Sequence, residues 1–291
     1  MQQVIADVCG RFEVLELPRA EAEVWPGLEW GRFDQPLTPA FWASQAWAAQ
    51  PERDENYQLG KSLAEEVIYC ILGGHGAPAE VGLAASRRVC AALPNATLPV
   101  LSVSVLDELL REPLIVNGKK VRYRFAAQRA RYLAGAMELL GDIVEVDLSD
   151  LALREALCGL PGVGPKTASW IVRNRRGSDS VAILDIHIVR ACAAMGVFPD
   201  NANPARGYAK LEERFLTFCH ATESRASAMD AVMWSTMRNI SHSFLQQLID
   251  PLDRLKQHAR SNSEEALLKE NNSCPDPAVR AVTLLDLVEA R

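Results

Sequence analysis

The chain has 291 residues, enough to bury one large or two small hydrophobic cores. Its composition, 48% hydrophobic and 23% charged, is that of an ordinary globular protein, and no apolar run is long enough to span a membrane. The net charge of −6 is the main objection to a nucleic-acid partner, since phosphate contacts favour a basic protein, although basic residues cluster at Lys119–Arg131 and Lys166–Arg176.

The seven cysteines are scattered and odd in number, which favours a reducing cytoplasm over a disulfide framework. No group of four follows the glycine-rich central segment at a spacing that would hold an iron–sulfur cluster. We find no signal peptide and no internal repeat. The composition therefore predicts a cytoplasmic protein without a bound metal.

In chain order, residues 1–40 form an N-terminal extension with one expected strand, Phe12–Leu17. Helical periodicity dominates from Pro39 to Leu255 and predicts a mainly all-α domain over residues 41–259. Residues 260–291 begin with a polar linker, Arg260–Pro277, and end with an expected helix, Ala278–Glu289.

Two segments before the centre of the chain attract attention. Gly73–Gly76, a loop with His75 at its tip, joins expected helices over Leu63–Leu72 and roughly Pro78–Leu93. Further on, basic and aromatic side chains interleave from Asn117 to Tyr132, a pattern typical of nucleic-acid contact. The alternative for this second segment is a solvated helix with its positive charges facing outward.

A glycine hairpin follows an expected short helix, Leu151–Cys158. Gly162 and Gly164 alternate around Val163, which predicts positive φ angles and exposed backbone N–H groups. Pro165 suits the first turn of the next helix, where its missing N–H has no partner to lose. The hairpin unit, residues 151–176, is therefore expected to grip a backbone phosphate, although a plain helix–turn–helix connection is the simpler alternative.

Lys166 stands at the start of that next helix, and Asp185 precedes another expected helix, Ile186–Met195. A lysine is ordinarily a solvated surface residue, but a helix N-terminus and partial desolvation both favour the neutral amine that a nucleophile requires. Asp185 is a natural N-cap, and a capping aspartate can still present its second oxygen to a cleft.

Asp230 and Trp234 lie four residues apart within a later apolar segment, so they share one helix face. A carboxylate only accepts hydrogen bonds, and a guanine-type base offers adjacent N1–H and N2–H donors. This pair therefore favours a guanine derivative as ligand, with Trp234 either stacking on the base or filling the core.

The string Leu160–Ala168, with Asp185 following Lys166 by 19 residues, resembles the helix-hairpin-helix DNA glycosylases and, within them, the lysine-bearing bifunctional 8-oxoguanine branch. The resemblance covers about Leu63–Asn239. It implies a two-lobed helical fold, with one lobe from Leu63 to Asp142 and the other bearing the hairpin.

The resemblance also implies a mechanism. Lys166 attacks C1′ of a flipped nucleotide and forms a Schiff base, while Asp185 stabilises the positive charge that develops on the sugar. The hairpin, Gly162 to Gly164, grips the phosphate. His187 lies near the phosphate of the flipped nucleotide, or is simply packed in its helix.

The remaining implied site residues surround the base. Asp230, Trp234 and Trp170 would form the pocket, with Trp170 either stacked on the base or buried in the core. His75 would act as the wedge, and Arg129 would bind the opposite base. This chain departs from animal members of the family in having Asp230 for glutamine, Trp234 for phenylalanine, and Glu80 for an arginine that reads cytosine, which leaves the opposite base open.

The implied partner is double-stranded DNA with a damaged or modified guanine. The protein is expected to act as a monomer in the bacterial cytoplasm, at the nucleoid, and to bind no membrane. No cofactor is required, although the hairpin allows a monovalent cation. Two alternatives stay open: an enzyme for another modified purine, such as a deazaguanine or a phage base met in a defence system, and a DNA-binding module without catalysis. The presence of both Lys166 and Asp185 argues against the second.

Overall fold

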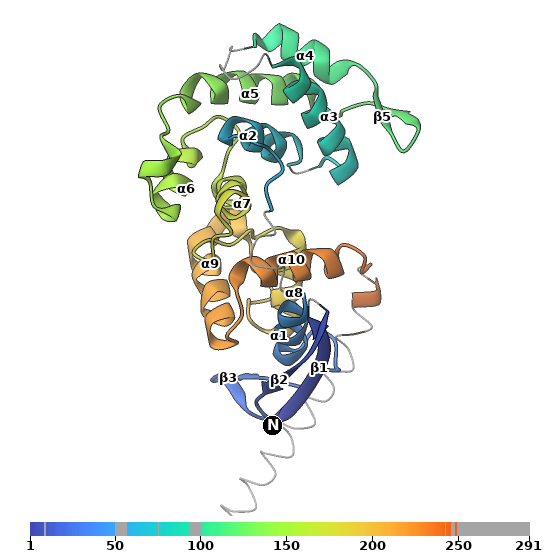
Figure 1. The fold of residues 1–291 in the computed structure, drawn as a ribbon, viewed down its shortest axis with the longest axis vertical. Helices are drawn as coiled ribbons and strands as arrows, with labels where there is room; N and C mark the ends of the chain where they lie inside the picture. The colour runs from blue at the N-terminus through green and yellow to red at the C-terminus, as the bar shows by residue number, and fades with distance from the viewer. Residues whose placement is uncertain are drawn as a thin grey trace, which may run out of the picture. The chain divides into compact units, whose positions relative to one another are not determined.

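The computed structural model describes residues 1–8, 10–49, 57–74, 76–93, 101–241, 243–245 and 248. His75, the expected linker and the expected C-terminal helix lie outside these residues. Met1–Asn239 forms one compact unit and Ile240–Arg291 another. The first unit is described below. It is mainly helical with short N-terminal strands, as the sequence predicted (Figure 1).

The N-terminal segment is an antiparallel hairpin of β1 (Gln2–Val8) and β2 (Arg11–Leu17), followed by the short pair β3 (Glu23–Trp25) and β4 (Leu28–Glu29). The expected strand at Phe12–Leu17 is confirmed as part of β2, whereas β1 was not predicted. Alternate side chains of β1 are half-buried, whereas β2 is exposed over its first four residues and buried only at Leu17. Leu17 and Trp30 pack there against α1 (Pro39–Ala48), whose first turn is capped by Thr38.

A first group of helices shares one hydrophobic core. Its largest fully buried side chains are aliphatic and include Ile68, Ile71, Leu72, Leu110, Leu133, Leu153 and Leu157. The group consists of α2 (Leu63–Leu72), α3 (Ala79–Ala92), α4 (Val103–Arg111), α5 (Ala126–Leu140), α6 (Asp150–Cys158) and α7 (Pro165–Arg176). A 3₁₀ turn, η1 (Glu145–Asp147), precedes α6.

One element of this group corrects the sequence-based expectation of continuous helix. The segment after α4 is a β-hairpin of β5 (Leu114–Val116) and β6 (Lys119–Val121). Its two turn residues, Asn117 and Gly118, have φ angles of 50° and 75°. An Asn-Gly pair adopts this left-handed geometry readily, which makes it a strong hairpin signal.

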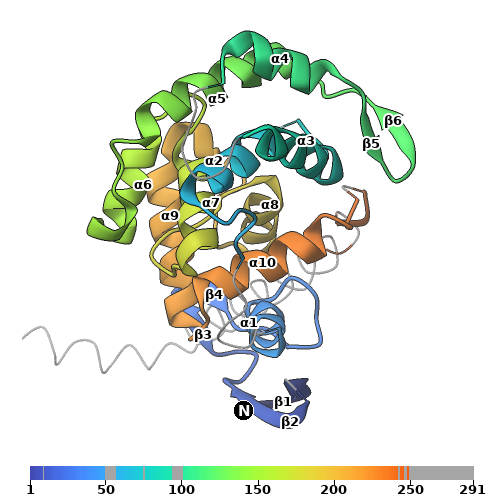
Figure 2. The same cartoon turned by 45° about the horizontal axis from the view of Figure 1, so that its top comes forward.

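A second group is formed by α1, α8 (Ile186–Met195), α9 (Pro204–Ala221) and α10 (Ala226–Met237). Helix α10 packs against the other three. In Figure 1, α7 lies below α2 and above the second group, and in the view of Figure 2 α9 and α8 lie on either side of α7. Over the described residues, every helix is too short or too polar to cross a membrane.

Candidate active site

The hairpin is closed by a hydrogen bond from Val163 N–H to the carbonyl of Leu160, at 3.1 Å. Gly162 has a φ of +79°, and a Cβ at this position would lie 2.5 Å from the ring of Tyr132. Both backbone conformation and space therefore require glycine here. The expectation of a positive φ at Gly164 is wrong, because its φ is −102° and its backbone is extended.

The N-terminus of α7 is open. Gly164 occupies its N-cap position and provides no side-chain hydrogen bond, and Pro165 has no N–H. The first helical hydrogen bond is donated by Ala168 to Gly164, so the N–H groups of Lys166 and Thr167 precede it. Val163 uses its own N–H within the turn. The positive end of the helix dipole is thus uncapped beside Gly164, as an anion site requires.

Lys166 is half-buried on this first turn of α7. The helix is anchored by the apolar side that the sequence predicted, since Ala168, Ile171 and Val172 are fully buried. Lys166 and Leu184 line the same open groove of about 720 Å³. The fold therefore brings the start of α7 beside the segment that leads into Asp185.

Asp185 caps α8, as the sequence predicted. Its Oδ1 accepts hydrogen bonds from the N–H groups of His187 (2.8 Å) and Ile188 (3.0 Å). Both bonds end on the same oxygen, which leaves Oδ2 outside the cap. His187 is half-buried, and its Nδ1 is enclosed without a hydrogen-bond partner among the described residues. The capping role and a catalytic role for Asp185 are thus geometrically compatible.

A buried carboxylate that the sequence did not single out holds these segments together. Glu212 of α9 accepts hydrogen bonds from Arg154 of α6, from Ser169 Oγ of α7 (3.4 Å) and from the N–H of Ala182 (3.0 Å). It is 6% exposed. A single glutamate in an amphipathic helix ordinarily indicates a solvated face, so the sequence contained no signal for this role.

Tyr208 reinforces the same segment. Its hydroxyl donates to the carbonyl of Ala182 at 2.5 Å and accepts from the N–H of Leu184 at 3.5 Å. Helix α9 therefore holds the backbone of the run Val181–Leu184 at two residues: Glu212 and Tyr208 both bind Ala182, and Tyr208 also binds Leu184. The position of Asp185 relative to α7 is set in this way.

Asp230 of α10 is 2% exposed and lies 3.0 Å from Nη2 of Arg173 on α7. The contact is an ion pair without hydrogen-bond geometry, because neither carboxylate oxygen has a hydrogen-bond partner among the described residues. Burial raises the pKa of Asp230 to about 7, against the opposing effect of the Arg173 charge. The negative charge of Asp185 also raises it, which places both carboxylates in one neighbourhood.

The two tryptophans differ in their surroundings. Trp234 is 38% exposed, and the guanidinium of Arg238 lies 4.6 Å from its ring centroid, so the core-filling alternative is wrong. Trp170 is half-buried against the first core, and a Cβ added to Gly73 would lie 3.2 Å from its ring. Trp170 therefore packs beside the loop that leads to His75.

Arg129 of α5 approaches that same loop. It is half-buried, and a Cβ at Gly74 would lie 3.1 Å from its Nη2. The alternative of a fully solvated helix face does not hold for this arginine. Glu80 is exposed on α3 and lies 3.8 Å from Arg238. The predicted roles of His75 and Arg129 stay predictions; the fold places Arg129 beside Gly74.

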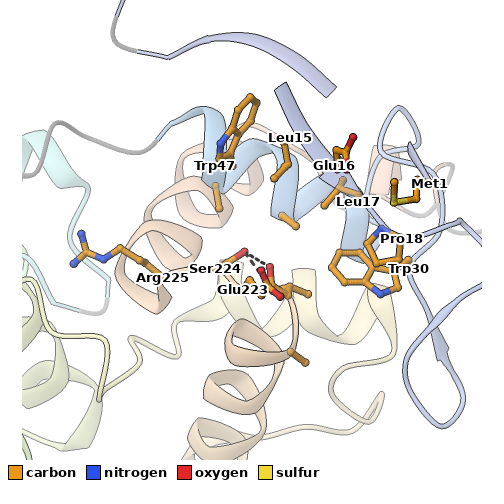
Figure 3. A pocket seen from close by; sticks show the side chains of 14 residues that line it. Met1, Leu15, Glu16, Leu17, Pro18, Trp30, Trp47, Glu223, Ser224 and Arg225 are labelled. Atoms are coloured by element: carbon orange, nitrogen blue, oxygen red, sulfur yellow. Dashed lines mark hydrogen bonds between the residues drawn. The ribbon is translucent and has the colours of Figure 1, made fainter. Parts of the chain in front are cut away.

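A separate cavity of about 540 Å³ lies between β2, α1 and the turn after α9 (Figure 3). Its walls are mainly apolar and include Leu15, Leu17 and Trp30. Arg225 points away from it and pairs with Asp179 at 2.9 Å. None of the predicted catalytic residues lines this cavity, so the site is assigned to the hairpin side. Within the described ranges, no cluster of His, Cys, Asp and Glu could hold a metal ion.

An open hairpin, a lysine on the first turn of α7 and an aspartate capping α8 form the constellation of a lysine-bearing helix-hairpin-helix glycosylase. The family model for 8-oxoguanine DNA glycosylase matches residues 49–224, more than half of the chain. The chain therefore belongs to this family.

Two curated relatives are each described as an 8-oxoguanine DNA glycosylase/AP lyase. The protein from Picrophilus torridus is 36% identical over 132 residues, which are 44% of this chain and 56% of that protein. The protein from Fusobacterium nucleatum subsp. nucleatum is 26% identical over 148 residues, 44% of this chain and 68% of that protein. The chain thus spans a little over half of the Picrophilus protein.

Solved structures of named 8-oxoguanine glycosylases are also similar. The enzyme from Thermotoga maritima gives a TM-score of 0.48 at 27% identity, covering 60% of this chain and 78% of that chain. The enzyme from Methanocaldococcus jannaschii was solved with a 15mer DNA containing 8-oxoguanine. It gives a TM-score of 0.49 at 24% identity, and the match covers 63% of this chain and 83% of that chain.

Proposed function

We propose that this protein is a bifunctional DNA glycosylase and AP lyase that removes 8-oxoguanine from duplex DNA. The observation that carries the proposal is the placement of Lys166 on the uncapped first turn of α7, beside the segment that ends in Asp185. Family membership and the relatives' named activity support the same reaction. All proposed catalytic groups come from one chain, so a monomer suffices.

In the proposed reaction, neutral Nζ of Lys166 attacks C1′ of the flipped nucleotide. The C1′–N9 bond breaks, and the base leaves with its electron pair and takes up a proton from the attacking ammonium. The nitrogen lone pair then expels O4′, so the C1′–O4′ bond breaks, the sugar ring opens and O4′ takes up a proton from water. Oδ2 of Asp185 stabilises the positive charge on the sugar. The resulting iminium acidifies C2′–H, and loss of that proton expels the 3′ phosphate by β-elimination.

The residues of the proposed base pocket favour a guanine substrate. Asp230 is enclosed on α10 near Asp185, and its ionised form accepts from N1–H and N2–H of a guanine-type base. Arg173 compensates part of its charge at 3.0 Å. Trp234, on the same helix face, has an exposed surface on which a base could stack.

Borohydride trapping on an 8-oxoguanine duplex tests this proposal. We expect a covalent adduct with the natural chain and with Lys61→Gln, a change at an exposed lysine outside the site. Lys166→Gln should give none, since an amide cannot form a Schiff base. Asp185→Asn should slow trapping by about 100-fold or more, as expected for loss of transition-state charge stabilisation.

Two results would redirect the proposal. Release of a different modified purine, with 8-oxoguanine untouched, would keep the chemistry and change the substrate. Tight binding of damaged duplexes without any base release would indicate a DNA-binding module and overturn the catalytic assignment.

A further inference from the structure

The groove beside Lys166 contains an unusual distribution of charge. It is lined by the start of α7 (Gly164, Pro165, Lys166), by Leu184, and by residues 204–210 of α9. Three of these side chains are basic and none is acidic, in a chain whose net charge is −6. The groove is therefore locally electropositive.

We infer that this groove binds a second phosphodiester of the DNA strand, next to the one at the hairpin, through Arg206 and Lys210. The inference rests on the proposed function, because it extends the same DNA substrate. It adds two contacts that the hairpin motif does not contain.

The two side chains are available for this role. Arg206 and Lys210 are both exposed, and neither forms an ion pair with any carboxylate of the described residues. Several other arginines are already paired with acidic partners, among them Arg154, Arg173, Arg175, Arg176 and Arg225. An unpaired cation loses little on meeting a phosphate, and it releases condensed counterions from the DNA when it does so.

The backbone of α9 adds to the site. Gly207 has non-helical angles (φ −157°, ψ 41°), so the helix is interrupted and resumes at Tyr208 beside the groove. A helix start directs N–H groups and the positive end of its dipole outward. The start of α7 contributes a second positive end to the same groove. Anion binding is thus supported by side chains and backbone together.

Tyr208 also ties the groove to the catalytic segment. Its hydroxyl holds the backbone of Ala182 and Leu184, immediately before Asp185. A phosphate seated between Arg206 and Lys210 would therefore lie in a fixed relation to the reacting sugar. Because a phosphate contact reads no base edge, the contact should be independent of sequence.

The salt dependence of binding tests this inference. The full chain is titrated with a duplex containing a tetrahydrofuran abasic analogue, between 50 and 300 mM salt, and fluorescence anisotropy is measured. For Arg206→Gln with Lys210→Gln, the slope of log K against log salt should fall by about 2, and affinity at 100 mM salt by about 10-fold or more. The matched control is Arg11→Gln with Arg19→Gln, which removes the same charge from exposed positions in the N-terminal segment.

Further measurements make the outcomes distinct. The control pair, Arg11→Gln with Arg19→Gln, should keep the natural single-turnover trapping rate, whereas the groove double variant should need about 10-fold more DNA to reach half of its own maximal rate. Arg206→Lys in the natural chain keeps the charge and should leave the slope of log K against log salt unchanged, as expected if the charge of this side chain is what binds the phosphate. Equal slopes for the double variant and its control, with catalysis intact, would overturn this inference alone. Failure of the natural chain to bind any damaged duplex would overturn the proposed function as well.

Discussion

At the scale of single residues, the two hairpin glycines serve different purposes. Gly162 is required by its left-handed backbone and by the ring of Tyr132. Gly164 has an ordinary extended backbone, and a Cβ there would meet no atom within 4 Å. This open space at Gly164 would let the proposed phosphate approach the start of α7.

Substitution separates these two roles. Gly162→Ala should lower the free energy of unfolding by about 2–4 kcal/mol, from a strained φ and a steric clash. Gly164→Ala should change it by less than about 1 kcal/mol but weaken binding of damaged duplex, since its methyl group enters the phosphate site. Urea unfolding and anisotropy measure the two effects. Similar destabilisation by both substitutions would contradict this division.

Asp230 predicts a pH dependence of stability. Its pKa is about 7 in the folded protein and 3.8 in the reference state. The native state therefore retains a proton that the unfolded chain has lost, so this group makes stability fall as pH rises from about 4 to about 7, with no further change above.

Asp230→Asn removes this titration. The free energy of unfolding of the natural chain, relative to that of the variant, should fall by a few kcal/mol (~1.4 for each pH unit between the two pKa values) from pH 4 to pH 8. Urea unfolding at both pH values measures it. A constant difference across this range would show that Asp230 titrates normally and is not buried as described.

At the scale of elements, α6, α7, α9 and the run before Asp185 meet at one carboxylate. Sheet pairing contributes nothing here, and each of these elements has its own apolar face. Glu212 is what relates their positions, because its two oxygens accept from three separate segments.

Glu212→Gln should lower the free energy of unfolding by about 3–5 kcal/mol, because it leaves Arg154 half-buried without its counter-charge. The neighbouring Glu213→Gln, at an exposed position of the same helix, should change it by less than about 0.5 kcal/mol. Urea unfolding compares the pair. Equal effects would show that Glu212 is not the junction of these helices.

At the scale of the whole molecule, the local charge of the groove beside Lys166 is opposite in sign to the net charge of the chain. The chain is acidic overall, yet the groove beside Lys166 is lined only by basic and uncharged residues. Long-range repulsion should slow the approach of DNA, while short-range contacts hold it once bound.

Removing exposed acids should therefore affect association rather than dissociation. Glu13→Gln, Glu21→Gln and Glu29→Gln together reduce the net charge of −6 by three units. We expect the association rate with DNA to rise several-fold at 20 mM salt and the dissociation rate to stay constant. Stopped-flow anisotropy measures both. The gain should vanish near 0.5 M salt, where screening is short-ranged, and a gain that persists there would contradict a steering effect.

Much of this protein was determined locally by its sequence. The bounds of α2 and α8, the cap at Asp185, the hairpin and the position of Lys166 all follow from patterns a few residues long. Helix periodicity, capping and glycine turns depend on residues within one or two turns of each other, so they can be predicted from the sequence without knowledge of the fold. The β5–β6 hairpin was legible in the same way from Asn117-Gly118, although its basic neighbours suggested only nucleic-acid contact.

Tertiary structure decided which side chains share an environment. Arg173 beside Asp230, Arg154 beside Glu212, and the exposure of Trp234 depend on segments far apart in the chain. Gly164 adopted an extended backbone because α7 begins directly after it. Pairing and burial are properties of packed neighbours rather than of sequence neighbours. The sequence therefore identified the chemical groups, and the fold determined which of them meet.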